Sequence, residues 1–287
     1  EALFGATNSS SFQDPAIAPI GTLYDQSRAY TDKYGSKIAL TRDDIWDDRI
    51  KATLGFDTLF DSSKQDLWST GRTYVPEINY TDLSPFLQLE FAPVESVKLS
   101  GGVRYEYARL KIDNYQTVWA NDRVKVEGGT PSFDQTLYNA GVVWTPIEPL
   151  SLFASYSEGF TVPDVGRVLR GIDTPGIKLN DYSGLQPIVT KNSEVGFRVQ
   201  QAPFDFEASY YKSTSKLGSR VELVNDAFVA RREKTEIDGV EISAGYSPNA
   251  DHKLTVAWSH MRGRYDSDDN GSLDAKLDRS EEHTSEL

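Results

Sequence analysis

Apolar and polar residues alternate with a period of two along many short stretches of this chain. Between residues 50 and 58, every even position is apolar or threonine, and every odd position is charged, polar or glycine. Residues 97–107 show the same alternation, and residues 150–157 show it except at Phe153. This period predicts β-strands with one apolar face and one polar face.

Further alternating stretches, some of them weaker, follow at regular intervals. They lie at residues 29–41, 83–91, 138–144, 195–199, 204–210, 240–246 and 254–260. Short turns are centred near residues 45, 94, 147, 202 and 250, so a hairpin recurs about every 50 residues. Long polar loops are expected between the hairpins, over residues 61–81, 113–131, 161–190 and 213–234, whereas residues 1–28 predict no firm element. The last loop is expected to have its own extension through residues 221–229.

Strands of about 9–11 residues with one apolar face have the length that a tilted strand needs to cross a bilayer. The two faces cannot both lie in a dry core, so the polar face is expected to line a wet interior. We therefore predict an all-β fold, an antiparallel up-and-down transmembrane β-barrel with short periplasmic turns and long outer loops. The chain supplies about ten or eleven of its strands, which makes a partial barrel.

A soluble all-β protein is the alternative that the pattern alone leaves open. Kelch-type propellers also repeat at a period near 50 residues. They pack four short strands into each repeat and fill both faces of the sheet. Each repeat here has two long strands with one wholly polar face, which favours the barrel.

Composition restricts the chemistry of the chain. The absence of cysteine excludes disulfides, a thiol nucleophile and thiolate metal sites, and three histidines argue against an imidazole-rich metal site. A net charge of −13 argues against nucleic acid as a partner, because nucleic acid needs a basic face. No run of 18 apolar residues predicts a membrane-spanning helix. The common catalytic motifs are also absent, so no enzyme activity is expected.

The two ends of the chain indicate a fragment. The sequence opens on Glu1 without a recognisable signal peptide. Residues 279–287 have no period of two and look like the translation of a sequencing-adapter oligonucleotide. We expect residues 1–278 to be the natural barrel segment and residues 279–287 to be a non-native tail, with a real acidic tail as the alternative.

Three short motifs resemble one protein family. Residues 156–163, YSEGFTVP, resemble the strand-to-loop signature of TonB-dependent outer-membrane receptors. Residues 191–197, KNSEVGF, and residues 237–242, IDGVEI, resemble the strand starts that follow in those receptors. The motifs occur in the family's order and at hairpin spacing, and the resemblance covers residues 29–265.

The resemblance implies a 22-stranded barrel that closes around an N-terminal plug in the cell outer membrane of a Gram-negative bacterium. Such receptors import ferric siderophores or similar scarce ligands with energy from the TonB complex. The implied partners are outer-membrane lipid, a ferric-siderophore-like ligand and, through the plug, the TonB complex; a monomer is expected. This chain departs from the family because it shows no plug and only about half the strands, so as it stands it should not transport.

Ligand contacts are expected from the outer loops and the interior face. Anionic ferric chelates suit arginine, lysine and tyrosine side chains, although ordinary solvated loop residues are the alternative. The candidates in the longest loop are Arg167, Arg170, Lys178 and Tyr182. The charged strand residues expected to face the interior are Arg104, Glu106, Arg198 and Glu207.

Residues 266–274, DSDDNGSLD, match the first nine positions of a calcium-binding loop. Leu277 stands at the position where a bidentate glutamate is expected. We expect at most weak calcium binding on an outer loop and no other cofactor, with a plain acidic loop as the alternative. The candidate ligands are Asp266, Asp268, Asn270 and Asp274.

The favoured hypothesis is a fragment of an active-transport receptor. A passive porin-like barrel is the first alternative, and it would lack a plug in its upstream sequence. A soluble secreted β-protein that binds glycans through its loops is the second, and it would be extractable without detergent.

Overall fold

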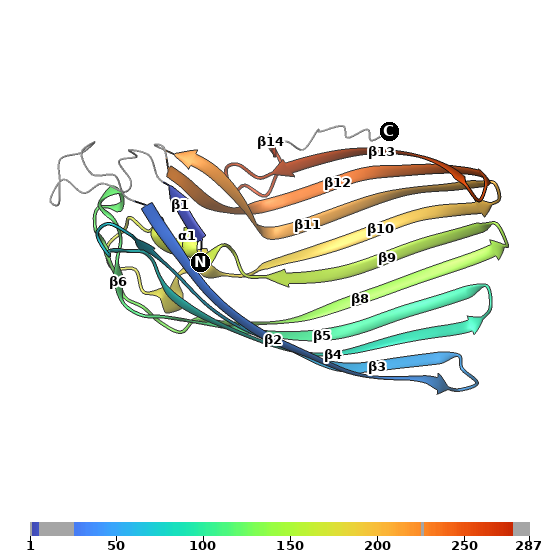
Figure 1. The fold of residues 1–287 in the computed structure, drawn as a ribbon, viewed down its shortest axis with the longest axis horizontal. Coiled ribbons are helices and arrows are strands. Elements are labelled where there is room, and N and C mark those ends of the chain that lie inside the picture. Colours follow the sequence, from blue (N-terminus) through green and yellow to red (C-terminus); the bar gives the residue numbers. More distant parts are fainter. Residues whose placement is uncertain (1, 6–25, 225–226, 278–287) are drawn as a thin grey trace.

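The computed structural model describes residues 2–5, 26–224 and 227–277. The predicted non-native tail, residues 279–287, lies outside these ranges. Twelve strands form one antiparallel sheet in the order β1-β2-β3-β4-β5-β8-β9-β10-β11-β12-β13-β14. Within the described ranges the sheet curves from β1 to β14 without closing (Figure 1), which confirms the predicted all-β, up-and-down partial barrel.

Ten of the strands are long, in agreement with the predicted ten or eleven. They are β2 (Gln26–Ile45), β3 (Ile50–Leu67), β4 (Thr73–Val94), β5 (Val97–Ile112), β8 (Ser132–Ile147), β9 (Leu150–Thr161), β10 (Ile188–Gln201), β11 (Phe204–Val224), β12 (Ala227–Asn249) and β13 (His252–Tyr265). The short strands are β1 (Ala2–Gly5) and β14 (Ala275–Lys276) at the sheet edges, and β6 (Tyr115–Gln116) and β7 (Lys125–Val126), which pair with each other.

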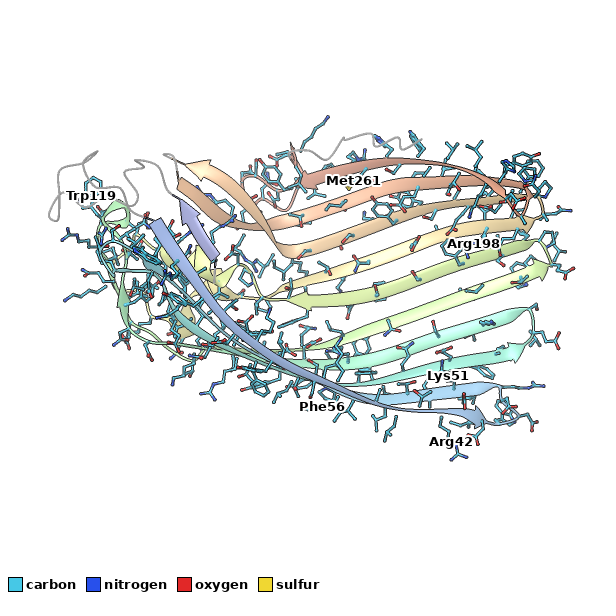
Figure 2. All side chains as sticks on the ribbon, in the orientation of Figure 1. Arg42, Lys51, Phe56, Trp119, Arg198 and Met261 are labelled. Atoms are coloured by element: carbon cyan, nitrogen blue, oxygen red, sulfur yellow. The ribbon has the colours of Figure 1, made fainter. Side chains whose placement is uncertain are left out.

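The two ends of the sheet differ as the sequence predicts. At the turn end, connections of two to four residues join the strands of each hairpin. At the loop end, the long connections 113–131 and 162–187 join β5 to β8 and β9 to β10. Figure 2 places Arg42 at the turn end and Trp119 at the loop end.

Towards the turn end, the strands have a mainly apolar outward face and a mainly polar inner face, as β5 shows. On β5, Leu99 and Val103 are exposed on the outward face, and they pair with Val142 and Tyr138 of β8. Arg104 points to the inner face, as expected. Exposed apolar side chains along neighbouring strands are typical of a surface that contacts lipid.

The predicted loop 61–81 is wrong, and of the predicted loop 213–234 only the extension through residues 221–229 agrees with the structure. β3 continues to Leu67 and β4 begins at Thr73, so most of residues 61–81 are strand. β11 likewise continues to Val224 and β12 begins at Ala227, within the predicted loop 213–234. The end of β3 is polar on both faces, so no alternation marks it in the sequence. Backbone hydrogen bonds to the neighbouring strands hold it in the sheet.

Phenylalanine rings interrupt the polar inner face at two places, where each lies over a glycine of the adjacent strand. Phe153, which breaks the alternation of β9, is paired with Gly196 of β10. Phe86 of β4 covers Gly55 of β3 in the same way. A side chain at either glycine would clash with the ring. The missing side chain thus makes room for an apolar group on the polar face.

Two loops fold over the inner face at the loop end and bury an apolar core. Besides β6 and β7, they contain η1 (Trp119–Asn121), α1 (Val165–Arg170), η2 (Leu179–Asp181) and η3 (Ser183–Leu185). No helix among the described residues is long and apolar enough to cross a membrane. We call residues 113–131 and 162–187 the mouth unit. The core beneath it consists of Val75, Ile78, Leu110, Ile112, Val124, Val126, Val165, Val168, Leu169, Ile172, Leu179 and Leu185.

Candidate functional site

A cavity of about 790 Å³ lies between the mouth unit and the inner face of β2–β5. Because every second residue of a strand faces inward, four neighbouring strands bring side chains distant in sequence onto one wall. Residues 160–166, which lead into α1, line the cavity as well. The charged and hydroxyl-bearing residues that line it include Lys33, Lys37, Asp57, Asp61, Tyr80, Asp82, Arg104, Glu106 and Asp164.

Arg104 of β5 joins three strands of this wall. Its Nη1 donates a hydrogen bond to Oδ2 of Asp57 on β3 at 2.7 Å, and its guanidinium lies 5.6 Å from the ring centre of Phe86 on β4. Its Nε donates to Glu106. Glu106 is only 8% exposed, so the guanidinium, rather than water, compensates its charge.

Asp82 lies beside this ion pair and takes part in a chain of hydroxyl contacts. The hydroxyl of Tyr80 donates to Asp82 at 2.9 Å, and the buried Ser84 hydroxyl contacts the carboxyl groups of both Asp82 and Glu106. A serine hydroxyl carries one hydrogen and therefore donates to only one of the two. The strand wall of the cavity thus carries a connected polar network, beside apolar residues such as Ile78 and Leu110.

The part of the wall on β2 and β3 adds cations. Lys33 forms an ion pair with Asp61 at 2.9 Å, and Lys37 stands opposite Asp57 in the strand register. Charged groups of both signs therefore surround the cavity. Such a surface suits a polar ligand that carries several hydrogen-bonding or charged groups.

Helix α1 carries two of the predicted ligand residues. Asp164 caps the helix, because its carboxylate accepts the backbone N–H of Arg167 at 2.9 Å and approaches the Nε of Arg167 at 3.4 Å. The guanidinium of Arg170 lies 5.3 Å from the ring centre of Tyr74. Both arginines line a second cavity of about 550 Å³, which shares Asp164 and Gly166 with the first.

The other loop of the mouth unit holds the end of α1. The hydroxyl of Tyr115 donates to the backbone oxygen of Leu169 at 2.7 Å. The side-chain amide of Asn121 donates to the backbone oxygen of Arg170. Burial raises the pKa of the Tyr115 hydroxyl. The position of both arginines therefore depends on residues about 50 positions earlier in the chain.

Lys178 and Tyr182 lie elsewhere in the mouth unit. Lys178 is exposed and pairs with Glu127 at 3.6 Å. Tyr182 is half-buried against the apolar core, where burial raises the pKa of its hydroxyl. Neither residue lines the two cavities. The structure thus brings Arg167 and Arg170 together but not all four predicted residues, and ligand binding by the four stays a prediction.

The strand wall is not marked by any motif. Arg104 was expected on the inner face, and it lies there, but nothing in the sequence joins it to Asp57 or Asp82. Only the register of β3, β4 and β5 reveals that these residues share one wall. Arg198 and Glu207 also face inward as expected, and they form an ion pair at 2.6 Å.

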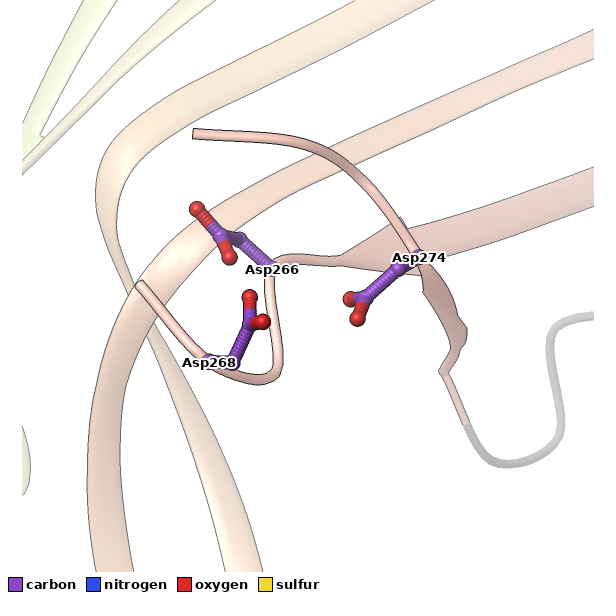
Figure 3. Close-up of side chains that lie close together, drawn as sticks. All are labelled: Asp266, Asp268 and Asp274. Carbon is purple, nitrogen blue, oxygen red and sulfur yellow. The ribbon is translucent and has the colours of Figure 1, made fainter. Parts of the chain in front are cut away.

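The acidic loop after β13 brings three of the four predicted calcium ligands together (Figure 3). One carboxylate oxygen from each of Asp266, Asp268 and Asp274 lies within 4.8 Å of the others. Asp266 is buried and accepts the backbone N–H groups of Asn270 at 3.1 Å and Gly271 at 2.6 Å.

Asn270 and Asp274 also have hydrogen-bond partners within this loop. Oδ1 of Asn270 accepts the backbone N–H of Ser272 at 2.8 Å, and its Nδ2 donates to Asp268. Asp274 accepts hydrogen bonds from both the backbone N–H and the hydroxyl of Ser267, which lower its pKa. The loop is therefore folded by its own hydrogen bonds, and calcium binding stays a prediction.

Comparison of the sequence with known proteins identifies related receptors. A family model described as "TonB dependent receptor-like, beta-barrel" matches residues 3–285. The rhizobactin receptor of Rhizobium meliloti (strain 1021) is 24% identical over 272 residues, which cover 82% of this chain and 36% of that receptor. The ferric aerobactin receptor of Escherichia coli is 27% identical over 282 residues, which cover 84% of this chain and 37% of that receptor.

Solved structures share the fold. The copper transporter OprC superimposes with a TM-score of 0.68 at 16% identity, over 87% of this chain and 40% of the transporter. The ferric yersiniabactin uptake receptor FyuA from Yersinia pestis gives a TM-score of 0.67 at 13% identity, over 91% of this chain and 39% of the receptor. The chain spans little more than a third of the length of the curated relatives it matches.

Proposed function

The chain belongs to the TonB-dependent receptor-like β-barrel family, and we propose that it is the barrel segment of a longer receptor for a ferric siderophore or a similar scarce ligand. Proteins of this family lie in the outer membrane of Gram-negative bacteria, and this chain is an outer-membrane barrel segment of that kind. The longer receptor would import its ligand with energy from the TonB complex, which it would contact through a plug. We propose a monomer without enzyme activity, and residues 279–287 as a tail foreign to it.

The observation that carries this proposal is the pair of connected cavities beneath the mouth unit. Arg167 and Arg170 line the cavity nearer the loop end, and the charged wall of β2–β5 lines the other. Arginine side chains suit the anionic oxygen groups that ferric chelates present. The two named relatives are receptors for ferric aerobactin and for rhizobactin, which makes these chelates suitable probes.

Titration of the detergent-solubilised chain with ferric aerobactin and ferric rhizobactin tests this proposal, with tryptophan fluorescence as the readout. Removing both cations in Arg167→Ala/Arg170→Ala should weaken binding about tenfold or more, since a charge-assisted hydrogen bond contributes about 1.5–3 kcal/mol. Arg198→Ala is the matched control, because it removes an inward-facing arginine that lines neither cavity. Equal affinities in all three proteins would contradict a site at α1.

A further inference from the structure

Five charged residues form a compact group on the outward face of β11, β12 and β13. Lys212, Asp238 and Arg262 stand in one row across the three strands, and Glu236 and Arg264 are paired in the row nearer the loop end. The register runs without a bulge from the apolar part of these strands into both rows. All five side chains therefore lie on the same face as the lipid-contacting residues and not on the ligand-facing interior. We call this group the outward cation cluster.

Within the outward cation cluster, the acidic side chains are mostly buried and the cationic side chains are more exposed. Glu236 bonds to Lys212 at 2.9 Å and to Arg264 at 2.5 Å, and Asp238 bonds to Arg262 at 3.1 Å. The two acidic side chains are only 12% exposed, whereas the three cationic side chains are 35–48% exposed. The acids thus hold the cations in place, while the cations present the surface. Three positive groups over two negative ones leave an excess of one positive charge.

The residues on either side of the outward cation cluster indicate its depth in the membrane. Towards the turn end, the same face carries exposed Tyr210 of β11 and Trp258 of β13. Towards the loop end, the acidic loop 266–274 begins directly after β13. The cluster therefore lies where the apolar surface ends. In a bilayer, that is the depth of the polar headgroups of the outer leaflet.

We propose that the outward cation cluster binds the phosphate groups of outer-leaflet lipid headgroups. Guanidinium groups match phosphate oxygens in a bidentate manner, and lysine adds a point charge. Cations that are already fixed by buried acids lose less side-chain freedom on binding than free ones do. The neighbouring outward pair on β9 and β10, Glu158 and Lys191, balances one acid with one cation and lacks the excess charge. The excess of fixed positive charge therefore distinguishes β11–β13 from the neighbouring strands β9 and β10.

Lipid binding by the full chain in a neutral detergent tests the proposal, with native mass spectrometry as the readout. The probes are diphosphoryl lipid A, monophosphoryl lipid A and inorganic phosphate. A cation close to an anionic lipid surface changes affinity about fivefold. The variant Lys212→Ala/Arg262→Ala/Arg264→Ala should bind diphosphoryl lipid A at least tenfold more weakly than the unchanged chain, and monophosphoryl lipid A should bind more weakly than the diphosphoryl form.

Two further variants separate the effect of the surface from general charge loss and from misfolding. Lys51→Ala/Lys98→Ala/Arg198→Ala removes three inward-facing cations and should keep full affinity. Lys212→Arg/Arg262→Lys/Arg264→Lys keeps the three positive charges and should also keep lipid A binding. This result would show that binding depends on the charges and not on the individual side chains. The milder Arg262→Ala should lose about fivefold.

Three results would overturn the proposal. The first is equal lipid A affinity of the triple-alanine variant and the unchanged chain. The second is an equal loss in the inward-facing control, which would indicate a general charge effect. The third is displacement of lipid A by inorganic phosphate at the same concentration, which would indicate a site for free anions and not for lipid headgroups.

Discussion

Leu99 and Leu110 lie on the same strand, β5, but they are in opposite environments. Leu99 is 39% exposed on the outward face, and Leu110 is fully buried on the inner face beneath the mouth unit. At the loop end of β5, the outward positions are Arg109 and Lys111, while Leu110 and Ile112 face inward. The apolar side of the strand thus changes face between its two halves.

This inversion shows that two different surroundings stabilise the same kind of residue. In one half of β5, lipid covers the outward apolar side chains, and polar side chains line the interior. In the other half, water is outside, and the protein's own loops cover the inner apolar side chains. The point of inversion marks where the strand leaves the bilayer. Substitutions in the two halves should therefore affect different properties, the stability of the mouth unit in one case and assembly into the membrane in the other.

The largest effect is expected from Leu110→Ala. Removing a fully buried leucine side chain costs about 2–5 kcal/mol, because a cavity remains where the side chain was. Hydrogen exchange of residues 113–131 and 162–187 should accelerate, while the exchange of the turn-end halves of β5 and β8 should not change. Leu99→Ala is the control and should leave exchange in the mouth unit unchanged; a similar acceleration in both variants would refute the division.

Leu99→Arg should act on membrane assembly instead. A charge on the lipid-facing side of a barrel strand costs about 2–4 kcal/mol near the bilayer midplane. The yield of sheet folded into lipid vesicles should fall, and Val103→Arg should behave alike. Lys98→Ala, on the inner face, should be tolerated, so equal sensitivity of both faces would contradict a barrel wall. Arg104→Ala is no matched control, because it would leave the buried Glu106 without its cation.

A smaller effect is expected from Tyr115→Phe, which removes the hydrogen bond to Leu169 and should destabilise the mouth unit by about 1 kcal/mol. Burial raises the pKa of Tyr115, so the folded state favours the neutral hydroxyl. Its contribution is complete below the unfolded value of about 10 and is lost as the pH rises further. Tyrosinate absorbance should show a late-titrating component that becomes smaller in the variant, while Tyr182 and the other late-titrating tyrosines keep the remainder. An unchanged amplitude would show that Tyr115 does not contribute to that component.

The smallest expected effect concerns calcium at the acidic loop. Isothermal titration of a peptide spanning residues 262–278 should show weak binding, with a dissociation constant on the order of 10⁻⁴–10⁻³ M. The pKa of Asp274 is lowered, so this ligand stays ionised at neutral pH, and binding should weaken only as the pH falls into the acidic range. Asp274→Asn should reduce the heat further. If no heat is detected at millimolar calcium, the loop is not a calcium site.

The strand order could be predicted because short turns recur between alternating segments. The extent of β3 could not, since the residues from Ser62 to Gln65 are polar on both faces and carry no period. The sequence also does not predict that the mouth unit folds over the inner face. Its apolar residues, such as Leu169 and Leu179, lie in irregular segments whose burial depends on strands far away in sequence.

The candidate site, like the fold, could be predicted only in part from the sequence. Arg167 and Arg170 stand out as cations in a long loop, and the structure places both at one cavity. Lys178 stands out for the same reason, yet it pairs with Glu127 outside that cavity. Loop sequence gives the residue types but not the direction in which a side chain points. Asp57 and Arg104 meet only through the strand register, which requires the paired structure.

The interlocked loops of the mouth unit have a consequence for recombination between related receptors. Tyr115 and Asn121 hold the end of α1, and Glu127 pairs with residue Lys178 of the other loop. A chimera that takes residues 113–131 from one parent and 162–187 from another would separate these partners and leave the shared core mismatched. Ligand preference should therefore be inherited only when both segments are exchanged together, as a single cassette.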